Sequence, residues 1–208
     1  MSYLDALDRI VQLESAAGLV VAAPASAQTA AVSTLTSAPA SATASPFAVT
    51  LDRAIEADAA FTGTPGARAL AAAEGEVGVA EVPPGSNDGP RIADYRSAVA
   101  GAAPGEPWCA YFVSWAAAQA GTPLGDSGQG LGSVAEITDW AQQTGRYLPA
   151  GSTPQPGDLM LFGDQHVGVV ESVNPDGSLT TIEGNYGNAV SRVHRMPSEA
   201  TGFVRLGA

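Results

Sequence analysis

The sequence contains one cysteine, two histidines and no lysine, so the side chains that commonly carry catalysis are scarce. All nine basic residues are arginine, and 21 acidic residues bring the formal net charge to −12. We therefore expect neither a nucleic acid nor an anionic membrane surface as partner, because both need a basic face. A single cysteine excludes an intramolecular disulfide. No apolar run approaches the roughly 20 residues of a membrane-spanning helix, so no membrane span is expected.

The N-terminal part of the chain has its own composition. Residues 1–16 predict a short amphipathic helix, because bulky apolar side chains recur on one face at helical spacing. Residues 17–60 are rich in Ala, Ser, Thr and Pro, and residues 15–51 contain no charged side chain. Such a stretch has too little bulky apolar surface to offset the entropy of ordering, which predicts a flexible linker. A second small domain is the alternative.

The start of the chain also bears on localisation. Gly18–Ala30 resembles the small-residue end of a secretion signal, but three acidic residues and one arginine precede it. A signal peptide needs a positive start, so we expect no ordinary cleaved signal. A short amphipathic start followed by a polar tract resembles the beginning of some flagellar-export substrates. That likeness implies a flagellar-type or another non-classical export route, and a protein partner for the apolar face of the helix.

From about residue 61 the pattern becomes that of a folded domain, which we expect over residues 61–208. Four segments bounded by Gly, Pro or Ser predict helices, at residues 65–78, 89–101, 109–121 and 133–145. After Pro156 the apolar period falls to two and predicts short strands, at residues 157–162, 166–173, 178–185, 189–196 and 201–206. Helices followed by antiparallel strands indicate the α+β class, with the helices packed on a sheet of about five strands.

The single cysteine, Cys109, begins the third predicted helix, in the segment PWCAYFVSWAAAQAG over residues 107–121. A thiol in the first turn feels the unpaired N–H groups and the positive end of the helix dipole, which favours the thiolate. A free cysteine is also commonly a small buried hydrophobe. The helix alone leaves both interpretations of Cys109 open.

A predicted hairpin brings one of the two histidines close to polar partners. The segment NPDG, residues 174–177, is a strong turn signal with Pro, Asp and Gly at favourable positions. Folding the strands about this turn places His166 opposite about Tyr186, within one residue of Asn185. The other histidine, His194, is expected in a structural role or at the surface.

Two neighbours of His166 suit it to serve a thiol. Glu183 lies one diagonal step away, and it shares a strand face with Asn185 because the two are two residues apart. Thiol catalysis needs a base for the thiol proton and a third group that fixes the tautomer of the imidazole. Either Glu183 or Asn185 could supply that third group. An ordinary polar patch on the sheet is the alternative.

Three blocks of sequence carry a family resemblance: PWCAYFVSWAAAQAG, PGDLMLFGDQHVGVVESV and TIEGN. In order and spacing they resemble the CHAP family, the cysteine, histidine-dependent amidohydrolases/peptidases, over about residues 66–208. The resemblance implies a papain-like fold and cleavage of amide bonds in peptidoglycan. It implies Cys109 as nucleophile and His166 as general base and then acid. It further implies that Glu183 orients the histidine and that Asn185 supports or polarises it.

The resemblance also bears on the oxyanion of the reaction. It implies the backbone N–H of Cys109 as one donor. Trp108 departs from the glutamine that many relatives carry at that position, and the sequence identifies no second donor.

No cofactor or metal is expected from the sequence. Some relatives bind calcium ahead of the cysteine through closely spaced aspartates, and here only Asn87, Asp88 and Asp94 offer oxygens. Calcium stays an alternative on that basis. Zinc is not expected, because no thiolate pair exists and the two histidines are 28 residues apart in the sequence.

The sequence therefore predicts a thiol-dependent peptidoglycan hydrolase that cuts an amide bond. The bond would lie between muramic acid and its peptide, or within the stem or cross-bridge peptide. The expected place of action is the cell envelope or the extracellular space, and the arginine-only, alanine-rich composition is typical of a bacterial genome of high GC content. A non-catalytic cell-wall binding or assembly factor, associated with the flagellum, is one alternative. An acyltransferase of the same fold is another.

Overall fold

The computed structural model describes residues 63–207. The helix predicted over residues 1–16 and the linker predicted over residues 17–60 lie outside the described residues. The domain predicted over residues 61–208 is described except for its first two residues and its last one.

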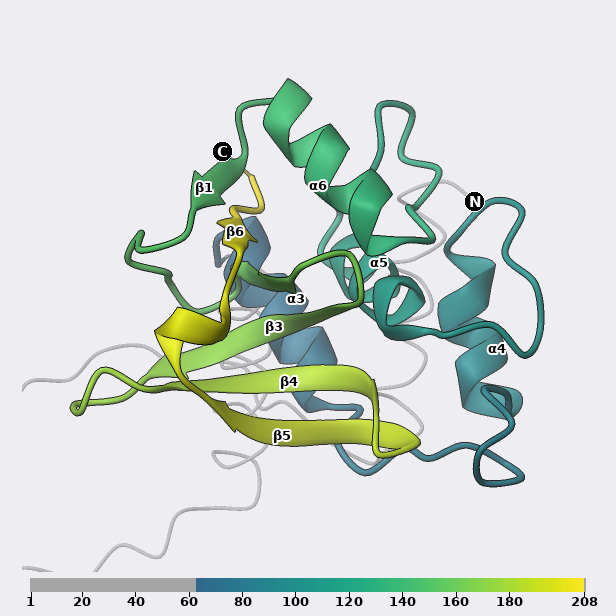
Figure 1. The fold of residues 1–208 in the computed structure, drawn as a ribbon. Helices are drawn as coiled ribbons and strands as arrows, with labels where there is room; N and C mark the ends of the chain where they lie inside the picture. The colour runs from purple at the N-terminus through teal and green to yellow at the C-terminus, as the bar shows by residue number, and fades with distance from the viewer. Residues whose placement is uncertain (1–62, 208) are drawn as a thin grey trace, which may run out of the picture. The chain divides into compact units, whose positions relative to one another are not determined.

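All four predicted helices are present (Figure 1): α3 Pro65–Glu74, α4 Pro90–Ser97, α5 Cys109–Gln119 and α6 Val134–Gln143. Each ends earlier than predicted, because the residues just before its closing glycine form turns. The start of α6 shows why these boundaries are sharp. Ser133 Oγ accepts from Glu136 N at 3.2 Å, and Glu136 Oε2 accepts from Ser133 N at 3.0 Å. This reciprocal pair satisfies two backbone donors that a helix start otherwise leaves free.

The strands form one six-stranded antiparallel sheet in the order β1-β6-β2-β3-β4-β5. They are β1 Tyr147–Pro149, β2 Leu159–Phe162, β3 His166–Val173, β4 Leu179–Tyr186, β5 Ala189–Arg195 and β6 Gly202–Val204. The five predicted strands are all present, and the α+β class is confirmed. The additional strand, β1, escaped prediction because it ends at a proline, which argues against a strand in a sequence pattern. It ends at Pro149 and lies at the sheet edge, where a proline is tolerated.

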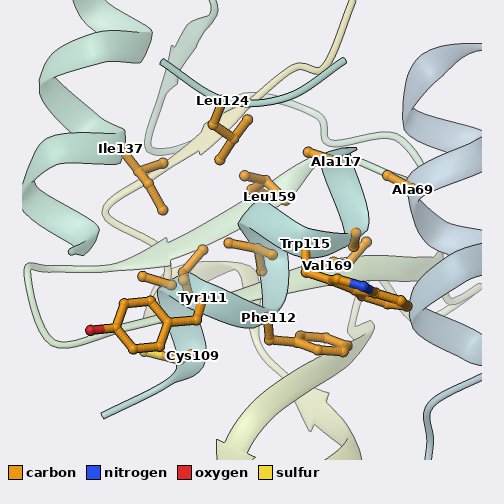
Figure 2. Packing of buried hydrophobic residues seen from close by; sticks show 14 of the residues in the cluster. Ala69, Cys109, Tyr111, Phe112, Trp115, Ala117, Leu124, Ile137, Leu159 and Val169 are labelled. Atoms are coloured by element: carbon orange, nitrogen blue, oxygen red, sulfur yellow. The ribbon is translucent and has the colours of Figure 1, made fainter. Parts of the chain in front are cut away.

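The helix that carries Cys109 is enclosed by its neighbours. Nine of the 11 residues of α5 are buried, and the helix contacts α3, α4, β3 and β4. Figure 2 shows Phe112 and Trp115 of α5 within this core, together with Leu159 of β2 and Ala69 of α3. A helix that is covered on nearly all sides is apolar around its circumference. This burial holds the first turn of α5, and Cys109 with it, in a fixed place.

Both faces of the sheet are covered by apolar side chains near its centre. Leu159 and Leu161 of β2 belong to the larger core beneath the helices. Met160, between them, belongs to a second cluster, whose buried members are Met160, Val170, Leu179, Ala200 and Phe203. Neighbouring residues on a strand point to opposite faces, so the two clusters cover opposite faces of the sheet. The strands beside His166 and Glu183 are thereby fixed from both sides.

Candidate active site

Cys109 is both nearly buried and open to a groove. It is the first residue of α5, and its exposed fraction is only 4%. It lines a groove with a volume of about 320 Å³, whose other lining residues include Pro107, Ala110, Gly132, Ser133, Asp164 and Gln165. The two sequence interpretations of the thiol therefore both describe part of its setting. A packed backbone fixes the sulfur, and the groove gives a substrate access to it.

His166 is the first residue of β3, an interior strand of the sheet, and its side chain interacts with Cys109 at the start of α5. Its Nε2 atom lies 2.8 Å from Glu183 Oε2, which leaves Nδ1 for the Cys109 thiol. Burial lowers the pKa of His166, but hydrogen bonding and charge from Cys109 and Glu183 outweigh it and raise that pKa to about 9. The imidazole therefore holds its proton at neutral pH. A carboxylate and a sulfur on either side of it account for this state.

Glu183 is a fully buried carboxylate, with an exposed fraction of 0%. Its Oε1 atom accepts from Thr181 Oγ1 at 2.6 Å and from Arg195 Nε at 2.8 Å. Its Oε2 atom accepts from His166 Nε2 and from Arg195 Nη2, the latter at 2.7 Å. Burial raises the pKa of Glu183, but hydrogen bonds from Arg195, His166 and Thr181 outweigh this and lower it to about 2. The imidazole thus faces a full negative charge that water does not reach.

The predicted hairpin is present, with a difference in register. Asn174 N donates to Ser178 O at 2.8 Å, so the turn closes where the NPDG signal places it. A bulge then interrupts the pairing between Val170 and Ser172. Because a bulge sets two residues on one strand against one on its partner, the far end of the hairpin moves by one position. Nothing in the sequence pattern of β3 marks this extra residue.

The shift changes which residues stand opposite one another at the open end of the hairpin. Continued past the bulge, the pairing aligns His166 with Asn185, whereas the unbulged hairpin aligned it with Tyr186. The same register puts Glu183 over Gly168: a Cβ added to this glycine would lie 2.6 Å from Glu183 Cγ. The absence of a side chain at Gly168 therefore makes room for the carboxylate that holds His166.

Asn185 has a different position from the one predicted. Its φ angle is 61°, and the pairing of β4 with β5 is irregular between Glu183 and Tyr186. The side chain therefore does not stay beside Glu183 on one strand face. With the amide oriented to satisfy its neighbours, Oδ1 accepts from Trp108 N, and Nδ2 donates to Asn87 Oδ1 and to Glu81 Oε1, each at 3.2 Å.

The support of the imidazole by Asn185 stays a prediction, and the contacts given for its amide are with Trp108, Asn87 and Glu81. These contacts attach the end of β4 to the residue that caps α5, directly before Cys109. The left-handed backbone of Asn185, which asparagine tolerates better than most residues, is what turns its side chain there.

Glu81 is a buried carboxylate that the sequence did not predict as part of the site. Its exposed fraction is 2%, and its Oε1 atom accepts from the indole Nε1 of Trp108 at 3.0 Å. Its Oε2 atom accepts from Asn87 N, also at 3.0 Å. The indole N–H of Trp108 is therefore occupied by Glu81. An acidic residue between two apolar ones, in the segment VAEVP, was the available signal, but it does not reveal the partner.

Two of the oxygens considered for calcium are engaged with arginines. Asp88 Oδ1 accepts from Arg96 at 3.0 Å, and Asp94 Oδ2 accepts from Arg91 at 2.9 Å. Over residues 63–207, no group of three or more His, Cys, Asp or Glu side chains is placed to hold a metal ion. His194 is exposed and stands opposite Thr180 in the sheet, away from the thiol.

Part of the chain matches a known domain family. Residues 101–185 match the family model of the CHAP domain. The resemblance found in the sequence is thereby confirmed. Cys109, His166, Glu183 and Asn185 all lie within the matched residues. No match to a curated protein or to a solved structure was significant.

The CHAP domain supports a function of the peptidoglycan-hydrolase type in general, and the cell wall as the place of action. In the part of the chain that the structure describes, no helix combines the length and the apolar character needed to cross a membrane.

Proposed function

We propose that this protein hydrolyses an amide bond of peptidoglycan by thiol catalysis, with Cys109 as nucleophile and His166 as proton carrier. The observation that supports this most is the line from the thiol through the imidazole to the buried, charged Glu183. The groove beside Cys109 gives an extended substrate a route to the sulfur. The cell envelope or the extracellular space is the proposed place of action.

The first chemical step is acylation. In the resting site His166 already holds the proton, so Cys109 starts as a thiolate beside an imidazolium, and the thiolate sulfur attacks the carbonyl carbon of the amide. The tetrahedral intermediate carries its negative charge on the former carbonyl oxygen. The C–N bond then breaks, the amine leaves with the proton from His166, and a thioester of Cys109 remains. A protonated imidazole at neutral pH suits this transfer to the leaving amine.

The second step returns the enzyme to its starting state. Water enters where the amine left, and His166 takes one of its protons while the oxygen attacks the thioester carbon. The C–S bond breaks, a carboxylic acid is released, and the sulfur recovers the thiolate beside the imidazolium. In both steps the backbone N–H of Cys109, in the first turn of α5, is the proposed donor to the oxyanion.

Glu183 acts in this mechanism through the imidazole. Accepting from Nε2 fixes the tautomer and presents Nδ1 to the sulfur, and the negative charge stabilises the imidazolium. The fourth residue, Asn185, is assigned a different role: it holds the start of α5 through Trp108, so it contributes to the position of the thiol.

Digestion of purified peptidoglycan by the full chain, followed by mass spectrometry of the muropeptides, tests the proposal. When the digestion is run in water enriched in oxygen-18, an amide hydrolase should place one labelled oxygen in each new carboxyl group. The masses of the fragments then identify which amide bond was cut. Products joined to an added amine, without label, would instead indicate an acyltransferase. If the protein bound the wall but released no new amino or carboxyl groups over several hours, the result would contradict the proposal and favour a non-catalytic wall-binding factor.

Replacing Glu183 with glutamine should lower kcat by more than about tenfold, because the imidazolium loses its charged partner. The loss of a nearby negative charge lowers the pKa of His166 from about 9. The alkaline limb of the pH profile of kcat/KM should therefore move to lower pH. Glu171→Gln is the matched control, since Glu171 pairs with Arg192 at 2.7 Å on the same sheet, away from the thiol. An unchanged alkaline limb in Glu183→Gln would contradict the role assigned to Glu183.

A further inference from the structure

We propose that Arg195 is a positioning residue of this active site, whose guanidinium holds the buried Glu183 carboxylate in place against His166. The proposal deepens the thiol mechanism and rests on it. Arg195 lies on β5, beyond the residues that match the CHAP domain model.

The contacts between Arg195 and Glu183 fit the shape of both groups. Nε of Arg195 lies 2.8 Å from Oε1 of Glu183, and Nη2 lies 2.7 Å from Oε2. The planar guanidinium therefore grips both carboxylate oxygens at once, which is the strongest form of this pair and fixes the plane of the carboxylate. Oε2 is also the atom that accepts from His166 Nε2. Oε2 of Glu183 thus contacts both the guanidinium and the imidazole. The orientation of the guanidinium therefore affects the orientation of the imidazole.

Two aromatic rings confine the guanidinium. Its central carbon lies 4.5 Å from the ring centroid of Phe162 and 5.1 Å from that of Tyr186. The same two rings stand beside His166, at centroid distances of 5.6 and 6.3 Å. A third contact, from Nη1 to Glu199 at 3.1 Å, holds the far side of the group. The side chain, 16% exposed, has little freedom left, so it can define where Glu183 points.

Charge explains what Arg195 adds beyond geometry. The pKa of a buried carboxylate that has no cation beside it rises well above its ordinary value. The ionisable groups that face this pair are His166 on β3, Tyr186 on β4 and Glu199 in the η1 turn, Pro197–Glu199, and Cys109 on α5 lies behind the imidazole. Arg195 stays charged at every pH of interest, so it keeps Glu183 negative and acceptor-only while His166 gains and loses its proton. Without Arg195, the side chains of His166 and Thr181 are the remaining hydrogen-bond partners given for the Glu183 carboxylate.

Carboxyl-carbon NMR of the full chain as a function of pH tests the proposal, with the Glu183 signal assigned from its loss in Glu183→Gln. In the wild type this signal should not titrate between about pH 4 and pH 8. In Arg195→Met it should titrate within that range, because the buried carboxyl loses the cation that binds both of its oxygens and keeps only the imidazolium at one of them. The acid limb of the pH profile of kcat/KM should move to higher pH by about one unit or more, together with the titration of Glu183.

Arg192→Met supplies the matched control. Arg192 is on the same strand and pairs with Glu171, but it is half exposed and does not touch the site. It should leave both the Glu183 signal and the pH profile as in the wild type. A Glu183 that stays ionised across the range in Arg195→Met, or a loss of activity equal at every pH, would overturn the proposal.

A conservative variant guards against misfolding. Arg195→Lys keeps the charge and loses the two-point grip, so Glu183 should stay ionised while kcat falls by about tenfold. A lysine variant as active as the wild type would overturn the positioning role even if the methionine variant does not fold. A wild type with an ionised Glu183 and no hydrolysis would contradict the proposed function, not the role of Arg195 toward the carboxylate.

Discussion

Replacement of Cys109 by alanine should abolish release of new amino and carboxyl ends from peptidoglycan, with kcat falling by about 10⁴-fold or more. The sulfur forms the covalent intermediate in the proposed mechanism, and this chain has no second thiol to replace it. The loss should be chemical rather than structural. Alanine fits the first turn of a helix, and a nearly buried thiol gives way to a smaller apolar group, so the thermal midpoint should change little.

The single cysteine also makes the alternative measurement clean. Iodoacetamide can alkylate only Cys109, so inactivation of the wild type should follow the addition of one label per chain. Cys109→Ser should be nearly as inactive as Cys109→Ala, because His166 is arranged for a sulfur and a hydroxyl holds its proton far more tightly. Wall hydrolysis retained by the alanine variant would exclude the thiol mechanism.

The arrangement of charges at the site is continuous from the thiol to the far edge of the sheet. Cys109, His166, Glu183, Arg195 and Glu199 follow one another in contact, and acidic groups alternate with basic ones. Each buried charge is thus neutralised by its neighbours, which is the condition under which charges persist away from water. The high pKa of the imidazole and the low pKa of Glu183 follow from this alternation.

Local sequence signals predicted the elements that carry the site. The apolar segment with small residues before Gly121 produced α5, and the NPDG turn produced the hairpin of β3 and β4. Both signals act over a few residues, because helix spacing and turn geometry depend on nearby backbone preferences. The turn was enough to predict His166 and Glu183 as neighbours, whereas the approach of Cys109 to them depends on the packing of α5 against β3 and β4.

The remaining parts of the site depend on contacts between distant segments. The bulge in β3 has no residue pattern of its own, so the pairing of Val169 with Ile182 beyond it could not be derived. Glu81 binds a tryptophan 27 positions later, and Arg195 binds a glutamate 12 positions earlier. Neither pairing follows from periodicity, because a charged residue on an alternating strand looks the same whether it meets solvent or a buried partner. The left-handed backbone of Asn185, with φ at 61°, was not predicted either, because its position in an alternating segment suggests an extended strand.

Replacement of His166 by alanine should reduce kcat by about 10³-fold or more, because the thiol loses its base and the leaving amine loses its acid. The wild type should stay active up to about pH 9, where the imidazolium beside the sulfur loses its proton. His194→Ala is the matched control: it removes the other histidine, exposed and opposite Thr180 on the sheet. Its activity and its pH profile should equal those of the wild type. If His194→Ala were as inactive as His166→Ala, the proton carrier would not be the imidazole that Glu183 holds. If instead His166→Ala retained most of its turnover, the thiol would have to lose its proton to water, and the alternation of charges from Cys109 to Arg195 would serve the fold alone.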